Sequence, residues 1–158
     1  MADRLHTRRQ IAEQFGILFE RTGSPRMAGR IWGWLLTCDP PRQTAAKIAG
    51  ALEVSAGSIS TMTRMLMQIG LIERVGIPGE RSGYYRIRPG GVTEILRARM
   101  RFTTEIRAIA ERGLEELPDA PAAVRGRLEE HRDLCAFFER EFSTLIERWQ
   151  QQHRGRAQ

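Results

Sequence analysis

Between residues 57 and 68 the chain carries small, polar and cationic side chains at helical spacing. Arg64 has a guanidinium that can bond a guanine edge or a phosphate, and Gln68 has an amide that suits adenine. Hydroxyl groups can bond phosphate oxygens, and small residues let a helix approach a groove closely. This combination predicts a helix face that contacts DNA, with the N–H groups of Gly57 and Ser58 facing anions. The predicted contacts on this helix are Gly57, Ser58, Ser60, Thr61, Arg64 and Gln68.

Further hydroxyls and cations flank that helix. Thr44 and Ser55 stand where two helices would begin, so each can cap a helix and lie close to a phosphate. Arg81 follows a Pro-Gly turn, and an arginine on a narrow loop can enter a minor groove, with Glu80 placed to orient it. Arg86 lies on the next strand and suits a phosphate contact. For any one of these residues alone, an exposed side chain without a role is the commoner case.

The apolar pattern predicts a mostly α-helical fold with one small β-wing. A short helix, a turn, a second helix and a hairpin follow one another, which is the order of a winged helix-turn-helix. On the second of these helices we expect Ile59, Met62, Leu66 and Ile69 to form the buried stripe. The predicted helices cover residues 4–21, 25–38, 45–52, 56–69, 92–117 and 121–152, and the predicted strands cover 71–75 and 84–88.

Aromatic side chains near the N-terminus allow a second kind of site. Trp32 and Trp34 cannot share one narrow helix face, so at least one must meet another element or a ligand. A pocket for an apolar or cationic small molecule is one interpretation. Packing in the core or a dimer interface is the other, and aromatic residues at helical spacing favour it. The candidate pocket residues are Phe15, Phe19, Trp32, Trp34 and Phe102.

Composition narrows the class of protein. The 158 residues carry a net charge of +6, with seven cations and three acids between residues 40 and 90 and twelve of each after residue 90. The basic excess is therefore local, as in a protein with one nucleic-acid-binding surface. The sequence has no run of about 18 apolar residues, so no membrane span is predicted. The N-terminus lacks a signal-peptide pattern, and we therefore expect a cytoplasmic protein.

The sequence offers little for catalysis, metal binding or a cofactor. His6, His131 and His153 have no nucleophile or carboxylate at a recognisable spacing, and no phosphate-binding glycine motif occurs. Cys38 and Cys135 have no partner at metal-binding spacing. We expect two buried thiols, with a redox sensor as the alternative.

Several stretches of the chain resemble one family. Pro25 to Leu36 (PRMAGRIWGWLL), Cys38 to Pro41 (CDPP), Thr44 to Ala49 (TAAKIA) and Gly57 to Thr61 (GSIST) occur together and in order. They resemble the MarR superfamily of bacterial transcription regulators and, within it, the GbsR-like branch. The resemblance extends over nearly the whole chain.

The resemblance implies a homodimer that binds a palindromic operator, commonly represses, and is often released by a small ligand. It divides the chain into an N-terminal dimerisation helix (1–24), a winged helix-turn-helix (25–90), a C-terminal dimerisation region (91–152) and a flexible tail (153–158). The apolar stripe of the last helix is wider than one neighbouring helix would cover, which suits such a role. The dimerisation residues implied are Leu5, Phe138, Phe142, Leu145 and Trp149.

One alternative stays open from the sequence alone. The same fold could dock a protein partner, with the cations serving only solubility. A mobility-shift titration with duplex DNA separates this protein-interaction module from a sequence-specific regulator.

Overall fold

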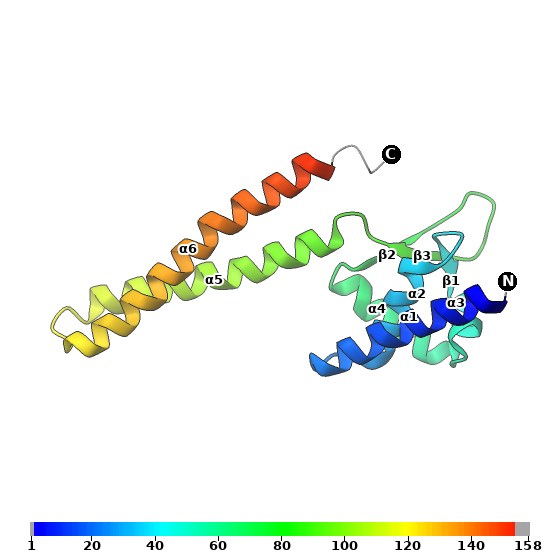
Figure 1. Cartoon of the computed structure of the whole chain (residues 1–158), viewed down its shortest axis with the longest axis horizontal. Helices are drawn as coiled ribbons and strands as arrows, with labels where there is room; N and C mark the ends of the chain where they lie inside the picture. Colours follow the sequence, from blue (N-terminus) through cyan, green and yellow to red (C-terminus); the bar gives the residue numbers. More distant parts are fainter. Residues whose placement is uncertain (1, 154–158) are drawn as a thin grey trace. The chain divides into compact units, whose positions relative to one another are not determined.

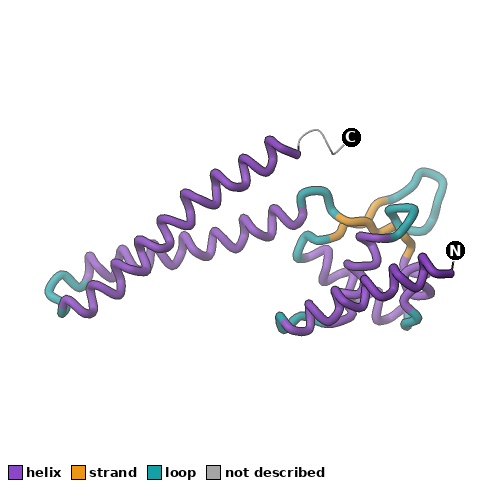
Figure 2. The backbone as a smooth tube through the Cα atoms, viewed as in Figure 1, coloured by secondary structure: helices purple, strands orange, loops and turns teal. Residues whose placement is uncertain are grey.

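Short helices and a small sheet alternate along the first part of the protein, and two long helices follow (Figures 1 and 2). The computed structural model describes residues 2–153, which divide into one unit ending at Val92 and another beginning at Thr93. The elements are α1 (Ala2–Arg21), α2 (Arg26–Thr37), β1 (Gln43–Thr44), α3 (Ala45–Leu52), α4 (Ala56–Gln68), β2 (Ile72–Val75), β3 (Tyr84–Ile87), α5 (Gly91–Glu116) and α6 (Ala122–His153).

The N-terminal helix α1 packs closely on α2 because glycines line their contact. A Cβ atom at Gly29 would overlap the carbonyl oxygen of Phe15, and one at Gly33 would lie 2.7 Å from Cδ2 of the same residue. Ala12 and Ile31 are fully buried beside this contact. Helix α1 is thus part of the same unit as the helix-turn-helix.

Both predicted helix caps are confirmed. The Thr44 hydroxyl accepts a hydrogen bond from the Lys47 amide at 3.2 Å and begins α3, and the Ser55 hydroxyl accepts one from the Ser58 amide at 3.3 Å and begins α4. Between the two helices Glu53 adopts a left-handed backbone conformation, with φ 57°. That conformation reverses the chain in three residues, so α4 starts directly after α3.

The wing belongs to a three-stranded antiparallel sheet in the order β1-β3-β2. In this sheet Ile72 pairs with Ile87, and Thr44 pairs with Tyr84. The hairpin of β2 and β3 was predicted, whereas β1 was not. Its two residues are too few to show the alternation by which a strand is recognised in a sequence.

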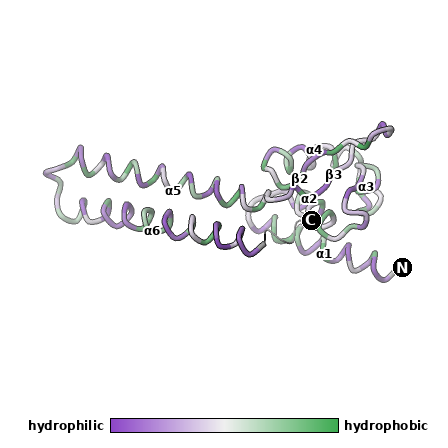
Figure 3. Tube along the Cα trace, turned by 90° about the horizontal axis from the view of Figure 1, so that it is seen from above, coloured by the Kyte–Doolittle hydropathy of each residue, from purple (hydrophilic) through white to green (hydrophobic). Residues whose placement is uncertain are grey.

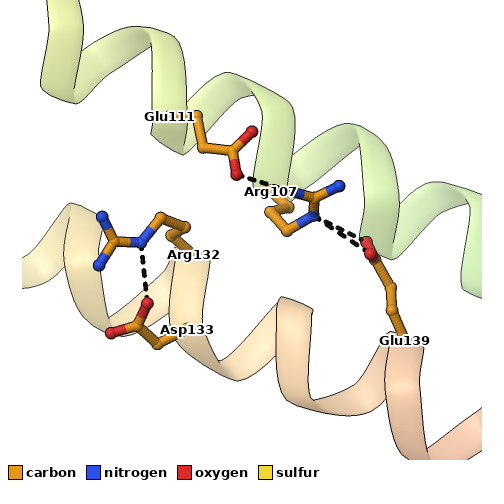
Figure 4. Close-up of polar contacts among 5 residues, drawn as sticks. All are labelled: Arg107, Glu111, Arg132, Asp133 and Glu139. Carbon is orange, nitrogen blue, oxygen red and sulfur yellow. Dashed lines mark hydrogen bonds and ion pairs between the residues drawn. The ribbon is translucent and has the colours of Figure 1, made fainter.

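Helices α5 and α6 form an antiparallel hairpin in the second unit. Arg107 donates through Nε to both carboxylate oxygens of Glu139, at 3.1 and 3.2 Å, and also pairs with Glu111 (Figure 4). Ala110, Cys135 and Ile146 are the buried apolar residues between the two helices. Figure 3 shows hydrophobic and hydrophilic residues interleaved along both of them.

Both long helices end close to the predicted positions. The predicted tail from His153 to Gln158 lies outside the described residues except for His153, which is the last residue of α6. Across residues 2–153, each helix is too short or too polar to cross a lipid bilayer.

Candidate nucleic-acid interface

Helix α4 turns its polar side to solvent and its apolar side to the core. Ile59 and Leu66 are completely buried, as the stripe predicted, while Met62 is half-buried. Ser58 is half-buried near the first turn. The exposed residues of this helix include Gly57, Ser60, Thr61, Arg64 and Gln68.

The predicted stripe needs two corrections. Ile69 is 42% exposed, because α4 ends at Gln68 and Gly70, with φ 80°, leads the chain away into β2. Thr63 takes a place in the core instead, at 1% exposure. Its hydroxyl donates to the Ile59 carbonyl at 2.8 Å, which satisfies the polar group and allows its burial.

The beginning of α4 is open on its outer side. A Cβ atom at Gly57 would meet no atom within 4 Å, so the backbone there is accessible. The backbone N–H of Ser58, which was expected to face an anion, instead donates to the Ser55 hydroxyl. The Ser55 and Thr44 side chains act as acceptors in their caps, and each hydroxyl keeps a hydrogen that can be donated to a phosphate.

The candidate cations differ in whether they already hold a partner. Within residues 2–153, Arg64 and Arg81 form no ion pair or hydrogen bond, and both are exposed. Arg86 pairs with Glu73, its cross-strand neighbour, with 2.6 Å between Nε and Oε1. Arg64 and Arg81 are therefore free to bind an anion, whereas Arg86 must first leave a carboxylate.

The wing is organised by a different contact from the one expected. Glu80 was expected to orient Arg81, but it accepts a hydrogen bond from the Tyr84 hydroxyl. This hydrogen bond raises the pKa of Tyr84 above its ordinary value. The Arg74 guanidinium lies across Gly83, where a Cβ atom would overlap its Nε. The wing arginine Arg81 is left exposed at the tip.

Three residues of the candidate aromatic pocket pack on one another. The rings of Phe15 and Trp32 meet edge to face with centroids 5.0 Å apart, and Phe19 lies 5.7 Å from Trp32. Trp34 is 5% exposed in the core. Phe102 belongs to the second unit and is 61% exposed. The first three rings thus fill the space between α1 and α2.

Several apolar side chains of the second unit face away from the α5–α6 contact. Phe142 is half-buried, and the neighbouring residues of α6 bound a shallow apolar groove of about 430 Å³. In the first unit Leu5 is also exposed. The large apolar residues of α6 that are exposed are Leu134, Phe137, Phe138, Leu145 and Trp149.

The thiols and acids of the described residues show no reactive arrangement. Burial raises the pKa of Cys38, so its thiol is protonated near neutral pH, and Cys135 is buried between α5 and α6. Across residues 2–153, no three His, Cys, Asp or Glu side chains gather as a metal site requires. Within residues 2–153, the thiols and acids thus add no second candidate site to the α4 face and the wing.

Arg30 and Glu53 are two residues near this surface that sequence reasoning missed. Arg30 donates to the carbonyl of Leu52, 22 positions along the chain, and Glu53 forms the left-handed turn before α4. A contact over that separation leaves no local pattern, and a left-handed glutamate occupies a position where glycine would be expected.

Comparison with known proteins assigns the family. Residues 90–152 match the family described as MmpR5-like MarR family transcriptional regulator. The HTH-type transcriptional regulator MmpR5 of Mycobacterium tuberculosis (strain ATCC 25618 / H37Rv) is 44% identical over 142 residues, which are 90% of this chain and 86% of that protein. A crystal structure described as a transcriptional regulator is also 44% identical, with a TM-score of 0.71 over 90% of this chain and 97% of the other. With its winged helix-turn-helix, this chain belongs to the MmpR5-like MarR family of transcriptional regulators.

Proposed function

We propose that this regulator is a homodimeric repressor that binds a palindromic duplex operator through α4 and the wing. The observation that carries the proposal is the division of α4. Its core side is closed by Ile59, Thr63 and Leu66, while its polar side is exposed and holds an arginine without an intramolecular partner in the described residues. A helix of this kind fits a major groove.

The residues fall into three kinds of contact. Arg64 and Gln68 read base edges, because only their side chains on this face are long enough to reach past the backbone. Arg81 enters a minor groove from the wing tip. The residues that bind phosphates are Thr44, Ser55, Gly57, Ser58, Ser60, Thr61 and Arg86.

The second unit supplies the dimer interface, together with Leu5 of α1. An exposed row of large apolar side chains along one helix is costly in water unless another surface covers it. A second copy of the chain offers the same row, and two-fold pairing covers both at once. In such a dimer the two α4 helices are spaced by one turn of DNA, about 34 Å.

A small-molecule effector releases the repressor in this proposal. The aromatic cluster of Phe15, Phe19 and Trp32 is its candidate site, since its rings join α1 to α2 and a ligand between them would move α1. Trp34 and Phe102 are the other candidates. We also propose the GbsR-like branch as the finer relationship, and a cytoplasmic location, where the protein meets its operator.

Selection of bound duplexes from a random DNA pool tests the proposal. We expect the selected sequences to be palindromic and to bind far more tightly than a scrambled duplex of equal length. Affinity should fall steeply as salt rises from about 50 to 200 mM, because each neutralised phosphate releases counterions. Equal binding of the selected and scrambled duplexes would contradict a sequence-specific regulator. No binding to any duplex at low salt would favour the protein-interaction module.

A further inference from the structure

Arg30 connects three helices from a half-buried position on α2. Its Nη2 donates to the main-chain carbonyl of Leu52 at the end of α3, at 3.0 Å, and its Nε lies 3.0 Å from a carboxylate oxygen of Glu13 on α1. The side chain is 23% exposed. A Cβ atom at Gly16 would lie 2.7 Å from its Cγ, so a glycine on α1 makes room for the arginine.

The Leu52 carbonyl, which accepts the hydrogen bond from Arg30, lies directly before the turn that leads to α4. It is among the last carbonyls of α3, and the carbonyls at the end of a helix lack partners inside it and favour a cation. The next residue, Glu53, has the left-handed conformation that turns the chain, and its carboxylate pairs with Arg9 of α1 at 2.6 Å. Ser55 then caps α4. The turn before α4 is therefore held from outside by two arginines, one on α1 and one on α2.

We propose that Arg30 is a positioning residue for DNA recognition: by holding the Leu52 carbonyl and Glu13 together, it sets the angle at which α4 is presented to the duplex. This inference rests on the function proposed above. Arg30 acts through the turn, because its guanidinium is already committed to Glu13 and a carbonyl. Its loss should therefore reduce the reading of bases and leave phosphate binding intact.

Arg26 provides a matched control on the same helix. It also pairs with Glu13, and with Glu20, but it forms no hydrogen bond or ion pair to the α3–α4 turn. Replacing either arginine by methionine removes an ion pair to Glu13 and keeps an apolar stem. Only replacement of Arg30 also removes a contact to the turn.

The experiment compares Arg30→Met, Arg26→Met and the unaltered protein by fluorescence anisotropy. The two probes are the duplex selected by the unaltered protein and its scrambled counterpart. We expect Arg30→Met to bind the selected duplex about tenfold more weakly, the order of losing one well-aligned contact to a base edge. Affinity for the scrambled duplex and the dependence on salt should stay unchanged, because no phosphate contact is lost. Arg26→Met should match the unaltered protein on both probes.

Three results would overturn the inference: equal loss on both duplexes in Arg30→Met, the same loss of preference in Arg26→Met, or a folded Arg30 variant with the original preference. If circular dichroism shows that Arg30→Met is unfolded, Arg30→Lys is compared with Arg26→Met on the same two duplexes. Its single ammonium cannot hold Glu13 and the carbonyl as a planar fork does, so a smaller loss of preference is expected. If the unaltered protein itself shows no preference, the proposed function fails rather than the role of Arg30.

Discussion

Arginine is almost the only cation in this chain, since 24 of its 25 basic residues are arginine, and single arginines do different work. Arg30 holds a backbone turn, Arg107 joins two long helices, and Arg86 pairs across a strand. Arg64 and Arg81 form no ion pair or hydrogen bond within the described residues. An exposed ion pair is worth about 0–1 kcal/mol, so Arg86 can still turn to a phosphate, though with a smaller gain than an unpaired arginine.

Replacing Arg64 should weaken binding to the selected duplex more than to other DNA. We expect Arg64→Ala to lose about 1–3 kcal/mol on that duplex, the usual contribution of a bidentate base contact. Fluorescence anisotropy with the selected and scrambled duplexes measures the difference. Arg127→Ala, which removes an exposed arginine from α6, is the control and should change neither affinity. If Arg64→Ala keeps the original preference for the selected over the scrambled duplex, Arg64 does not contact the bases.

The wing arginine should act through charge. We expect Arg81→Ala to bind all duplexes more weakly and to reduce the salt slope, since a cation is lost from the minor groove, where the negative potential of the duplex is deepest. Titrations at several salt concentrations give the slope. Arg86→Ala is the comparison and should show the smaller loss, because its guanidinium already has Glu73 as a partner. A larger effect at Arg86 would reverse the assignment.

At the scale of elements, α4 depends on Ser55, the residue that caps its N-terminus. Ser55 accepts the Ser58 amide, which would otherwise lack a partner at the helix end. We expect Ser55→Ala to lower the free energy of unfolding by about 1 kcal/mol, measured by urea denaturation without DNA. Ser60→Ala is the matched change on the exposed face of the same helix and should stay within about 0.5 kcal/mol. Similar losses in both would contradict the capping role.

The elements themselves were largely predictable from local signals. Prolines, glycines and N-cap hydroxyls mark helix ends, and the apolar spacing in each helix decides which side is buried. The prediction was wrong at Ile69 because the helix stops one residue earlier. Thr63 was missed because a threonine is counted as polar until its hydroxyl is seen to bond the helix backbone.

The candidate site was predictable only as far as its parts are local. The exposed side of α4 follows from periodicity, so Arg64 and Gln68 were placed on the outer face from the sequence. Pairings across the sheet and between helices depend on the folded chain. The Glu80 carboxylate accepts a hydrogen bond from Tyr84, and the Glu73 carboxylate accepts one from Arg86. Neither pairing was predicted from the sequence.

At the scale of the whole molecule, the second unit has more apolar surface than its own packing covers. Three buried apolar residues, Ala110, Cys135 and Ile146, lie between α5 and α6, while Leu145 is 58% exposed and Phe138 is 49% exposed. Two helices with so small a core gain stability when another copy covers their outer side. In the proposed homodimer, this pairing would add to the stability of the unit as well as place two DNA-binding faces together.

A charge placed in that apolar row should separate the two copies. We expect Leu145→Arg to sediment as a monomer and to lose binding to the selected palindrome, since a monomer reads only half of it. Gln151→Arg adds the same charge at an exposed position about 120° further around α6 and should remain dimeric. A dimeric Leu145→Arg protein would show that this row does not form the interface.

The glycines between α1 and α2 have a consequence for natural variation. At Gly29 and Gly33 even a single methyl group would collide with Phe15. Any other residue at these positions must therefore increase the distance between the two helices. A genetic selection for cells that have lost repression should accordingly recover alleles at these two codons as readily as alleles in α4. Such alleles would inactivate the regulator through the contact between α1 and α2, without a change on the exposed face of α4.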